Sequence, residues 1–118
     1  MGGVEVGDAP QVSVVLVTVP SVETGLDLAR AVIESRLAAC GNVIPGLTSV
    51  YWWKGRVDED NEALVLFKTT AALLPALEEK VLELHPYDVP EFLAMPVAAG
   101  HLPYLEWVAR ETINPDQE

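Results

Sequence analysis

LAACGNVIPGLTSVYWWK, residues 37–54, ends one expected helix and begins an unusually aromatic extended segment. Pro45 and Gly46 interrupt this segment, while Gly55 and the acidic stretch 58–60 indicate a connection into a second extended segment, 62–70. The two segments should pair as an antiparallel hairpin. An arm from Leu47 to Val57 would reach about 36 Å at ~3.3 Å per residue, close to the ~35 Å diameter of a compact chain of this length. We therefore expect the hairpin to extend beyond its own subunit.

Two further extended segments flank the hairpin in the sequence. Residues 11–19 are dense in Val and Leu on both sides, as expected of a strand that is covered on both faces. Residues 91–97 are interpreted as a fourth strand. Together with three expected helices, these segments give the order βαββαβα.

The helices are predicted from capping residues and apolar spacing. Ser21 can cap a first helix that runs to about residue 37, Pro75 suits the first turn of a second helix that Pro86 ends, and Gly100 and Pro103 begin a short third helix. The expected buried residues are Val22, Leu26, Ala29, Ile33 and Leu37 in the first helix, Leu77, Val81 and Leu84 in the second, and Leu105, Val108 and Ala109 in the third.

The order of elements predicts an α+β domain over 11–113, between a flexible N-terminal tail, 1–10, and a C-terminal tail, 114–118. Right-handed crossovers place the first two helices on one face of a four-stranded antiparallel sheet. The other face, rich in Val and Leu, then has no helix to cover it. A large apolar face of this kind predicts an oligomer that packs sheet to sheet.

Composition limits the functional classes. The chain has 118 residues, half of them hydrophobic, and a net charge of -11, which repels phosphate backbones and anionic lipid. We therefore expect neither a nucleic-acid partner nor a membrane. A single cysteine excludes an internal disulfide, and no signal-like segment or run of eighteen apolar residues is present. These features favour the reducing cytoplasm.

Residues 37–54 combine with Thr18-Val19-Pro20, Phe67-Lys68-Thr69 and the segment HPYDVPE, 85–91, in a set that resembles the CutA family of divalent-cation tolerance proteins from about Val14 to Trp107. The resemblance implies a cytosolic homotrimer of ferredoxin-like subunits that exchange long hairpins. It also implies a link to tolerance or binding of divalent cations, copper foremost. Some members carry Cys at the position of Val17 and a second His at that of Leu84, both proposed as copper ligands. Here only His85 is retained.

The loop after the second helix holds the best candidate site. His85, Tyr87, Asp88 and Glu91 fall within seven positions, and Pro86 and Pro90 stiffen the loop, so imidazole and carboxylate could converge on a cation or polar ligand. The alternative is structural, because histidine is favoured at a helix C-terminus and its neighbours can tie the loop down. Cys40 is a further metal or redox candidate, although a lone cysteine is more often a small buried hydrophobe.

Other side chains are assigned to a ligand cleft or to the subunit interface. Lys68 lies in an apolar strand, so it should either project from the strand end or pair with a carboxylate such as Glu62 or Glu91. Successive aromatic residues alternate faces, so Trp53 shares a face with Tyr51 and lies nearest a cleft. The cleft set is Lys68, Tyr87, Asp88, Trp53 and Glu62, and the interface set is Tyr51, Trp52 and Trp107.

The sequence contains no nucleophile with a paired base and no glycine-rich phosphate loop, so we expect a protein that is not an enzyme. The leading hypothesis is a divalent-cation protein that uses His85 and nearby acids. A second is a regulatory trimer similar to the P-II signalling proteins, which would hold a small effector between subunits with Lys68 as an anion anchor. A third is a scaffold without a ligand.

Overall fold

A computed structural model of the chain describes residues 9–114, so most of the two expected tails, 1–10 and 114–118, lies outside the described residues. The order of elements is the predicted βαββαβα, with one added turn of 3₁₀ helix before the second α-helix. The elements are β1 (Val12–Val19), α1 (Val22–Glu34), β2 (Cys40–Trp53), β3 (Arg56–Thr70), η1 (Ala71–Leu73), α2 (Leu74–Leu84), β4 (Leu93–Pro96) and α3 (Leu102–Arg110).

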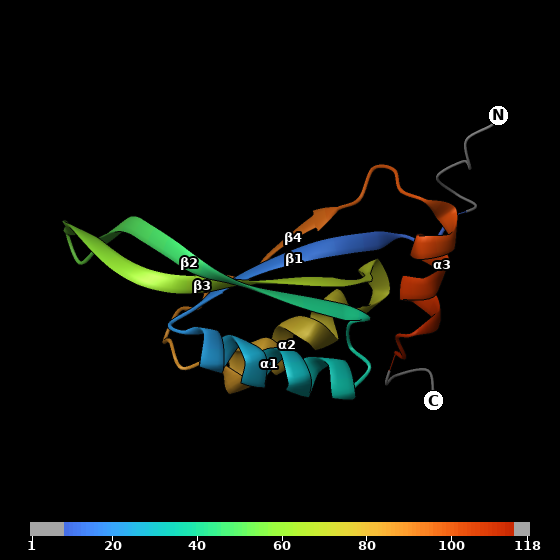
Figure 1. Cartoon of the computed structure of the whole chain (residues 1–118), viewed down its shortest axis with the longest axis horizontal. Helices are drawn as coiled ribbons and strands as arrows, with labels where there is room; N and C mark the ends of the chain where they lie inside the picture. The colour runs from blue at the N-terminus through green and yellow to red at the C-terminus, as the bar shows by residue number, and fades with distance from the viewer. Residues whose placement is uncertain (1–8, 115–118) are drawn as a thin grey trace.

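The four strands form one antiparallel sheet in the order β2-β3-β1-β4, which is the ferredoxin-like arrangement. Helices α1 and α2 lie side by side on one face of this sheet, while α3 stands at the end remote from the hairpin tip (Figure 1). The core lies between the sheet and the two long helices. Its fully buried members include Val17, Phe67, Leu77 and Val81.

The β2–β3 hairpin is confirmed, and it is longer than predicted. Asp58–Asp60 was interpreted as a connection, but these residues pair with Ser49–Tyr51 as regular strand. The reason is the two-residue turn Lys54–Gly55, in which both residues have positive φ, 51° and 79°, as a type I′ turn requires. The hairpin projects well beyond the helices (Figure 1) and gives the molecule extents of 50 × 33 × 23 Å.

The hairpin bends near its base. The pairing register shifts between Ile44 and Leu47, across Pro45 and Gly46, and Gly46 has a φ of 80°. A residue inserted into one strand in this way increases the local twist and re-aims the side chains beyond it. The outer half of the hairpin is thereby turned relative to the rest of the sheet.

The buried stripe predicted for α1 was right for Ala29 and Leu37 and wrong for Val22 and Leu26. The helix ends at Glu34 rather than near residue 37, and Val22 and Leu26 are 39% and 37% exposed. The side facing the sheet carries Gly25, where an added Cβ would lie 3.1–3.2 Å from side-chain atoms of the core. Glycine allows the helix to approach the sheet closely on this side. The residues buried in α1 are Gly25, Leu28, Ala29 and Val32.

The later helices follow the predicted stripes more closely. In α2, Leu77 and Val81 are fully buried as expected, but Leu84 is 43% exposed because it lies at the last helical position. In α3, Leu105 and Val108 are buried against Val12, and Ala109 is half-buried. Among the described residues, no helix is long and apolar enough to cross a membrane.

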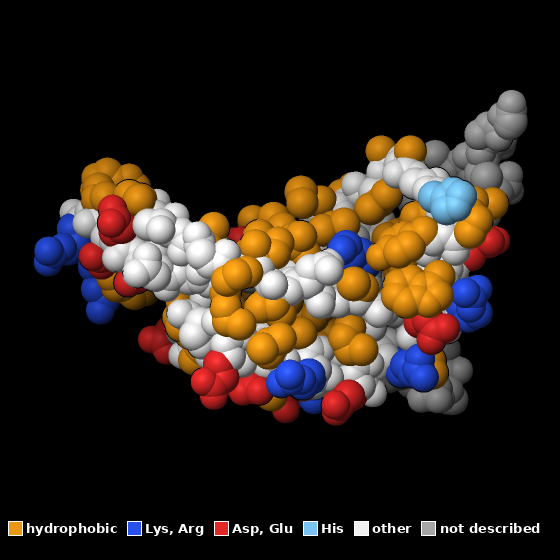
Figure 2. Space-filling model, viewed as in Figure 1, with side chains coloured by type: hydrophobic (Ala, Val, Ile, Leu, Met, Phe, Trp, Pro, Cys, Tyr) orange, Lys and Arg blue, Asp and Glu red, His pale blue; other side chains and the backbone are white. Residues whose placement is uncertain are grey.

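The second face of the sheet is largely uncovered, as the sequence predicts. Alternation along β3 places Ala63, Val65, Phe67 and Thr69 in the core, and their neighbours on the opposite face are only half-buried. Helix α3 covers one end of that face. Figure 2 shows hydrophobic side chains gathered across the middle of the molecule, between the hairpin and α3. We call this surface the open face; pairing and alternation place Val14, Leu16, Cys40, Asn42, Ile44, Leu64, Leu66, Lys68, Leu93 and Met95 on it.

Candidate functional site

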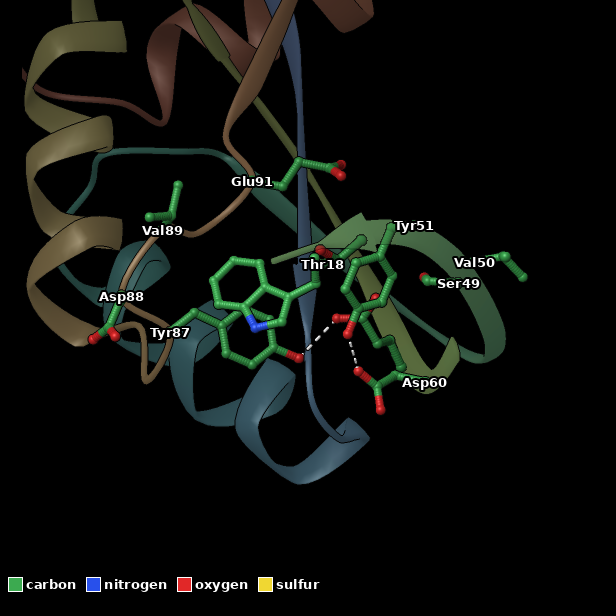
Figure 3. Close-up of a pocket in the computed structure, with 11 residues that line it drawn as sticks. Thr18, Ser49, Val50, Tyr51, Asp60, Tyr87, Asp88, Val89 and Glu91 are labelled. Atoms are coloured by element: carbon green, nitrogen blue, oxygen red, sulfur yellow. Dashed lines mark hydrogen bonds between the residues drawn. The ribbon is translucent and has the colours of Figure 1, made fainter. Parts of the chain in front are cut away.

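A cavity of about 550 Å³ lies at the base of the hairpin, where three segments meet. The end of β1 contributes Thr18, the hairpin contributes side chains from both of its strands, and the loop between α2 and β4 closes one side (Figure 3). The residues that line the cavity are Thr18, Ser49, Val50, Tyr51, Trp53, Asp60, Glu62, Tyr87, Asp88, Val89 and Glu91.

Two tyrosines in the cavity are each bonded to a carboxylate. Tyr87 Oη donates to Glu62 Oε2 at 2.7 Å, which ties the loop to β3. Tyr51 Oη donates to Asp60 on the facing strand, and the labelled side chains in Figure 3 show this pair directed into the same space as Tyr87. Each tyrosine hydroxyl therefore fixes the position of one acid.

These contacts also change how the tyrosines titrate. The hydrogen bond to Asp60 raises the pKa of Tyr51 to about 12, with smaller contributions from desolvation and from the charges of Asp60 and Asp58. Desolvation, followed by the hydrogen bond to Glu62, raises the pKa of Tyr87 far above its usual value. Both effects favour the neutral phenol, for Tyr51 chiefly through its hydrogen bond and for Tyr87 chiefly through burial.

His85, the leading metal-ligand candidate, has both ring nitrogens occupied. Nε2 donates to the Thr18 carbonyl oxygen at 2.7 Å, and Nδ1 accepts from the Tyr87 backbone N–H at 3.1 Å. The residue is 8% exposed, and its ring lies 4.7 Å, centroid to centroid, from the Tyr87 ring. In this arrangement His85 holds the loop between α2 and β4 in place. This is the structural role that the sequence offered as the alternative to metal binding.

The metal-ligand candidates do not come together. Within residues 9–114, no three side chains of His, Cys, Asp or Glu are grouped so that they could hold a metal ion. Glu91 lines the cavity, whereas His85 lies behind it and Cys40 begins β2 on the open face. A metal centre formed by His85, Glu91 and Cys40 within one chain is therefore not present in the structure.

Lys68 is not where the cleft hypothesis placed it. It does not line the cavity, and its ammonium donates to the Asn42 side-chain oxygen rather than to Glu62 or Glu91. Alternation along β3 places Lys68 on the open face, where it pairs directly with Cys40 on β2. The Cys40 Sγ also contacts the Asn42 side-chain oxygen, at 3.7 Å. The cavity consequently lacks the anion anchor that a P-II-like effector site would use.

The aromatic residues of the hairpin separate as their alternation predicts. Tyr51 and Trp53 both line the cavity, whereas Trp52 points to the other side and is 75% exposed. Trp107 is half-buried in α3, beside Tyr104 with ring centroids 5.5 Å apart. A subunit-interface role for Tyr51, Trp52 and Trp107 stays a prediction, since one chain cannot test it.

The sequence also missed part of the cavity. Asp60, Ser49 and Thr18 were not among the candidates, although Asp60 forms one of the two tyrosine–carboxylate pairs. Asp60 was missed because residues 58–60 were interpreted as a connection rather than as part of a strand. The signal was the register, because a two-residue turn after Trp53 brings Asp60 opposite Ser49 and within reach of Tyr51.

Comparison with known proteins identifies the family. A family model described as "CutA1 divalent ion tolerance protein" matches residues 13–111. The chain belongs to the CutA1 family. It is 54% identical over 99 residues to the divalent-cation tolerance protein CutA of Thermus thermophilus, an alignment that covers 84% of this chain and 96% of that protein. The solved structure of CutA1 from Oryza sativa superposes with a TM-score of 0.87 at 48% identity, covering 90% of this chain and 97% of the other.

Longer CutA proteins share only their matching domain with this chain. Human protein CutA is 50% identical over 101 residues, which cover 86% of this chain but 56% of the human protein. This CutA1 member thus spans nearly all of its bacterial relative and just over half of the human one. The shared segment includes the hairpin and the loop that form the cavity.

Proposed function

We propose that this CutA1 member is a cytoplasmic homotrimer that binds divalent cations, copper foremost, in the acidic cavity at the base of its hairpin. One observation carries the proposal: four carboxylates, those of Asp60, Glu62, Asp88 and Glu91, line the cavity, and no lysine or arginine lines it with them. The names of the relatives agree with a cationic ligand, since they describe divalent-cation tolerance. The proposed role is binding, without a chemical step.

The charge of the cavity supports a cation over an anion. Two of the four carboxylates are held by tyrosine hydroxyls, which leaves further oxygen lone pairs on each acid for a cation. At a given oxygen site, copper(II) generally binds more tightly than the other divalent first-row ions, so it is the expected occupant when several of them are offered. Because no three of these side chains within residues 9–114 are grouped closely enough to hold a metal ion, the proposal requires a second copy to complete the ligand set where copies meet at this edge.

The open face supports the trimer. Ile44, Leu93 and Met95 are 41%, 55% and 47% exposed there, side by side with half-buried Leu16 and Leu66. An acidic chain gains free energy by covering such a surface with a second copy of itself, at about 25 cal/mol per Å² of apolar area removed from water. Three copies, rather than two, are inferred from the family resemblance.

The test is calorimetric titration of the assembled protein with Cu(II), Zn(II) and Mg(II). Glu62→Gln and Glu91→Gln keep the shape of each side chain and remove its charge, and each should weaken Cu(II) binding at least tenfold, about 1.4 kcal/mol. Glu79→Gln, on the exposed side of α2 and outside the cavity, is the matched control and should bind as the parent does. Equal affinity in all three variants would remove the cavity as the cation site.

A further inference from the structure

The cavity contains more aromatic surface than a metal ion requires. Tyr51, Trp53 and Tyr87 all line it, together with the four carboxylates. Trp53 is 46% exposed and Tyr87 is 37% exposed in the single chain, so much of their ring surface is not used in the packing of their own subunit. A metal ion is held by closely spaced oxygen, nitrogen or sulfur atoms, and aromatic rings add nothing to that coordination. The rings therefore indicate a ligand with an apolar or polarised surface of its own.

Trp53 already attracts an ammonium group. Lys54 Nζ lies 5.7 Å from the centroid of the Trp53 ring, within the ~6 Å range of a cation–π contact. This contact shows that the indole lies where a primary ammonium can reach it. Tryptophan is also the side chain with the strongest attraction for organic cations.

The carboxylates and the aromatic rings lie next to each other in the lining of the cavity. Because Tyr51 and Tyr87 donate their hydroxyls to Asp60 and Glu62, the two rings are fixed in orientation beside these side chains. An ammonium ion that enters the cavity meets ring faces and carboxylates together. No lysine or arginine is among the lining residues, and Lys54, which lies beside Trp53, would give up its place near that ring to the ligand.

The geometry points to an organic ammonium ion, of the methylated kind carried by choline, as a ligand of this cavity. Methylated ammonium ions are weakly hydrated, so they lose little interaction with water when they bind in a cage of aromatic rings. The ring faces then attract their positive charge. The volume of about 550 Å³ is in the ~300–1,000 Å³ range of small-molecule sites, so it accommodates a head group with further atoms attached. The inference uses the cavity named in the proposed function but does not depend on a metal.

The test is a titration of the assembled protein, freed of metal by chelation, with choline chloride. The matched probe is 3,3-dimethylbutan-1-ol, which has the shape of choline without its charge. Trp53→Leu removes the main ring, and Trp52→Leu removes the adjacent tryptophan that points away from the cavity. Glu91→Gln, which preserves shape, provides a second test should Trp53→Leu fail to fold. Light scattering establishes that every variant keeps the parent's mass.

We expect choline to bind at least tenfold more tightly than the neutral alcohol, and Trp53→Leu and Glu91→Gln each to weaken choline about tenfold. Trp52→Leu should bind choline as the parent does. Equal binding of choline and the alcohol, or equal loss in the Trp52 and Trp53 variants, overturns the inference. If the protein binds Cu(II) but not choline, the inference is overturned and the proposed function stands. If it binds choline but not Cu(II), the inference is supported and the metal is removed from the proposed function.

Discussion

Replacing His85 separates a structural histidine from a metal ligand. In the native structure its Nε2–H donates to the Thr18 carbonyl at 2.7 Å, and its Nδ1 accepts from the Tyr87 N–H at 3.1 Å. His85→Ala leaves both backbone groups without these partners in a site where the residue was 8% exposed. It also removes the contact with the Tyr87 ring.

The expected cost follows from those three losses. An unsatisfied buried donor or acceptor costs about 1–3 kcal/mol, and water entering the space left by the ring reduces that cost. The lost aromatic contact adds about 0.5–1.5 kcal/mol. We therefore expect His85→Ala to lower the free energy of unfolding by about 2–4 kcal/mol.

The assay is urea unfolding, followed by circular dichroism at one fixed protein concentration, because assembly makes apparent stability depend on concentration. His101→Ala is the matched control, since His101 is exposed and its side chain does not cap α3; it should change stability by less than about 0.5 kcal/mol. Calorimetry with Cu(II) completes the comparison. A His85→Ala protein of parental stability that loses Cu(II) affinity tenfold would refute the structural role and identify His85 as a ligand.

Two further predictions concern the titration of Tyr51 and the packing of α1. The pKa of Tyr51 is raised from about 10 to about 12, so the folded state holds that proton more tightly than the unfolded state does. Stability should therefore fall as the pH rises through this interval. Asp60→Asn should return the pKa of Tyr51, measured by phenol absorbance, toward 10. Leu28→Ala should cost about 2–5 kcal/mol in urea unfolding and Leu26→Ala less than half as much, and equal costs would mean that the wrong side of α1 has been placed against the sheet.

The sequence predicted the sheet and its uncovered face because strand alternation and turn residues are local signals. It was only partly right for α1, where two apolar stripes run along the first turns of the helix, and only the fold shows that Gly25 allows the closer approach to the sheet. Periodicity gives the spacing of a buried stripe, but a choice between two stripes depends on what packs against them.

The cavity was predicted in part for a similar reason. Trp53, Glu62, Tyr87, Asp88 and Glu91 were candidates, and the structure places all five in its lining. Asp60 was missed because its place depends on hairpin register, which a two-residue turn sets and an assumed longer connection conceals.

Lys68 shows a limit of a different kind. Its isolated charge on an apolar strand correctly indicated that it needs a partner, but the expected acids lie elsewhere. The partner is the neutral Asn42 on the adjacent strand, brought near by the pairing of β2 with β3. Sequence reasoning identifies the need for a partner, whereas strand order and register decide which residue meets it.

The mass of the assembled protein in solution tests the central claim most directly, because both the trimer and any site shared between copies depend on covering the open face. Multi-angle light scattering at micromolar concentration should give three times the mass of one chain. Leu66→Glu, which puts a charge in the middle of the open face on β3, should shift the mass toward that of one chain. A parent protein that has the mass of one chain at this concentration would contradict the account.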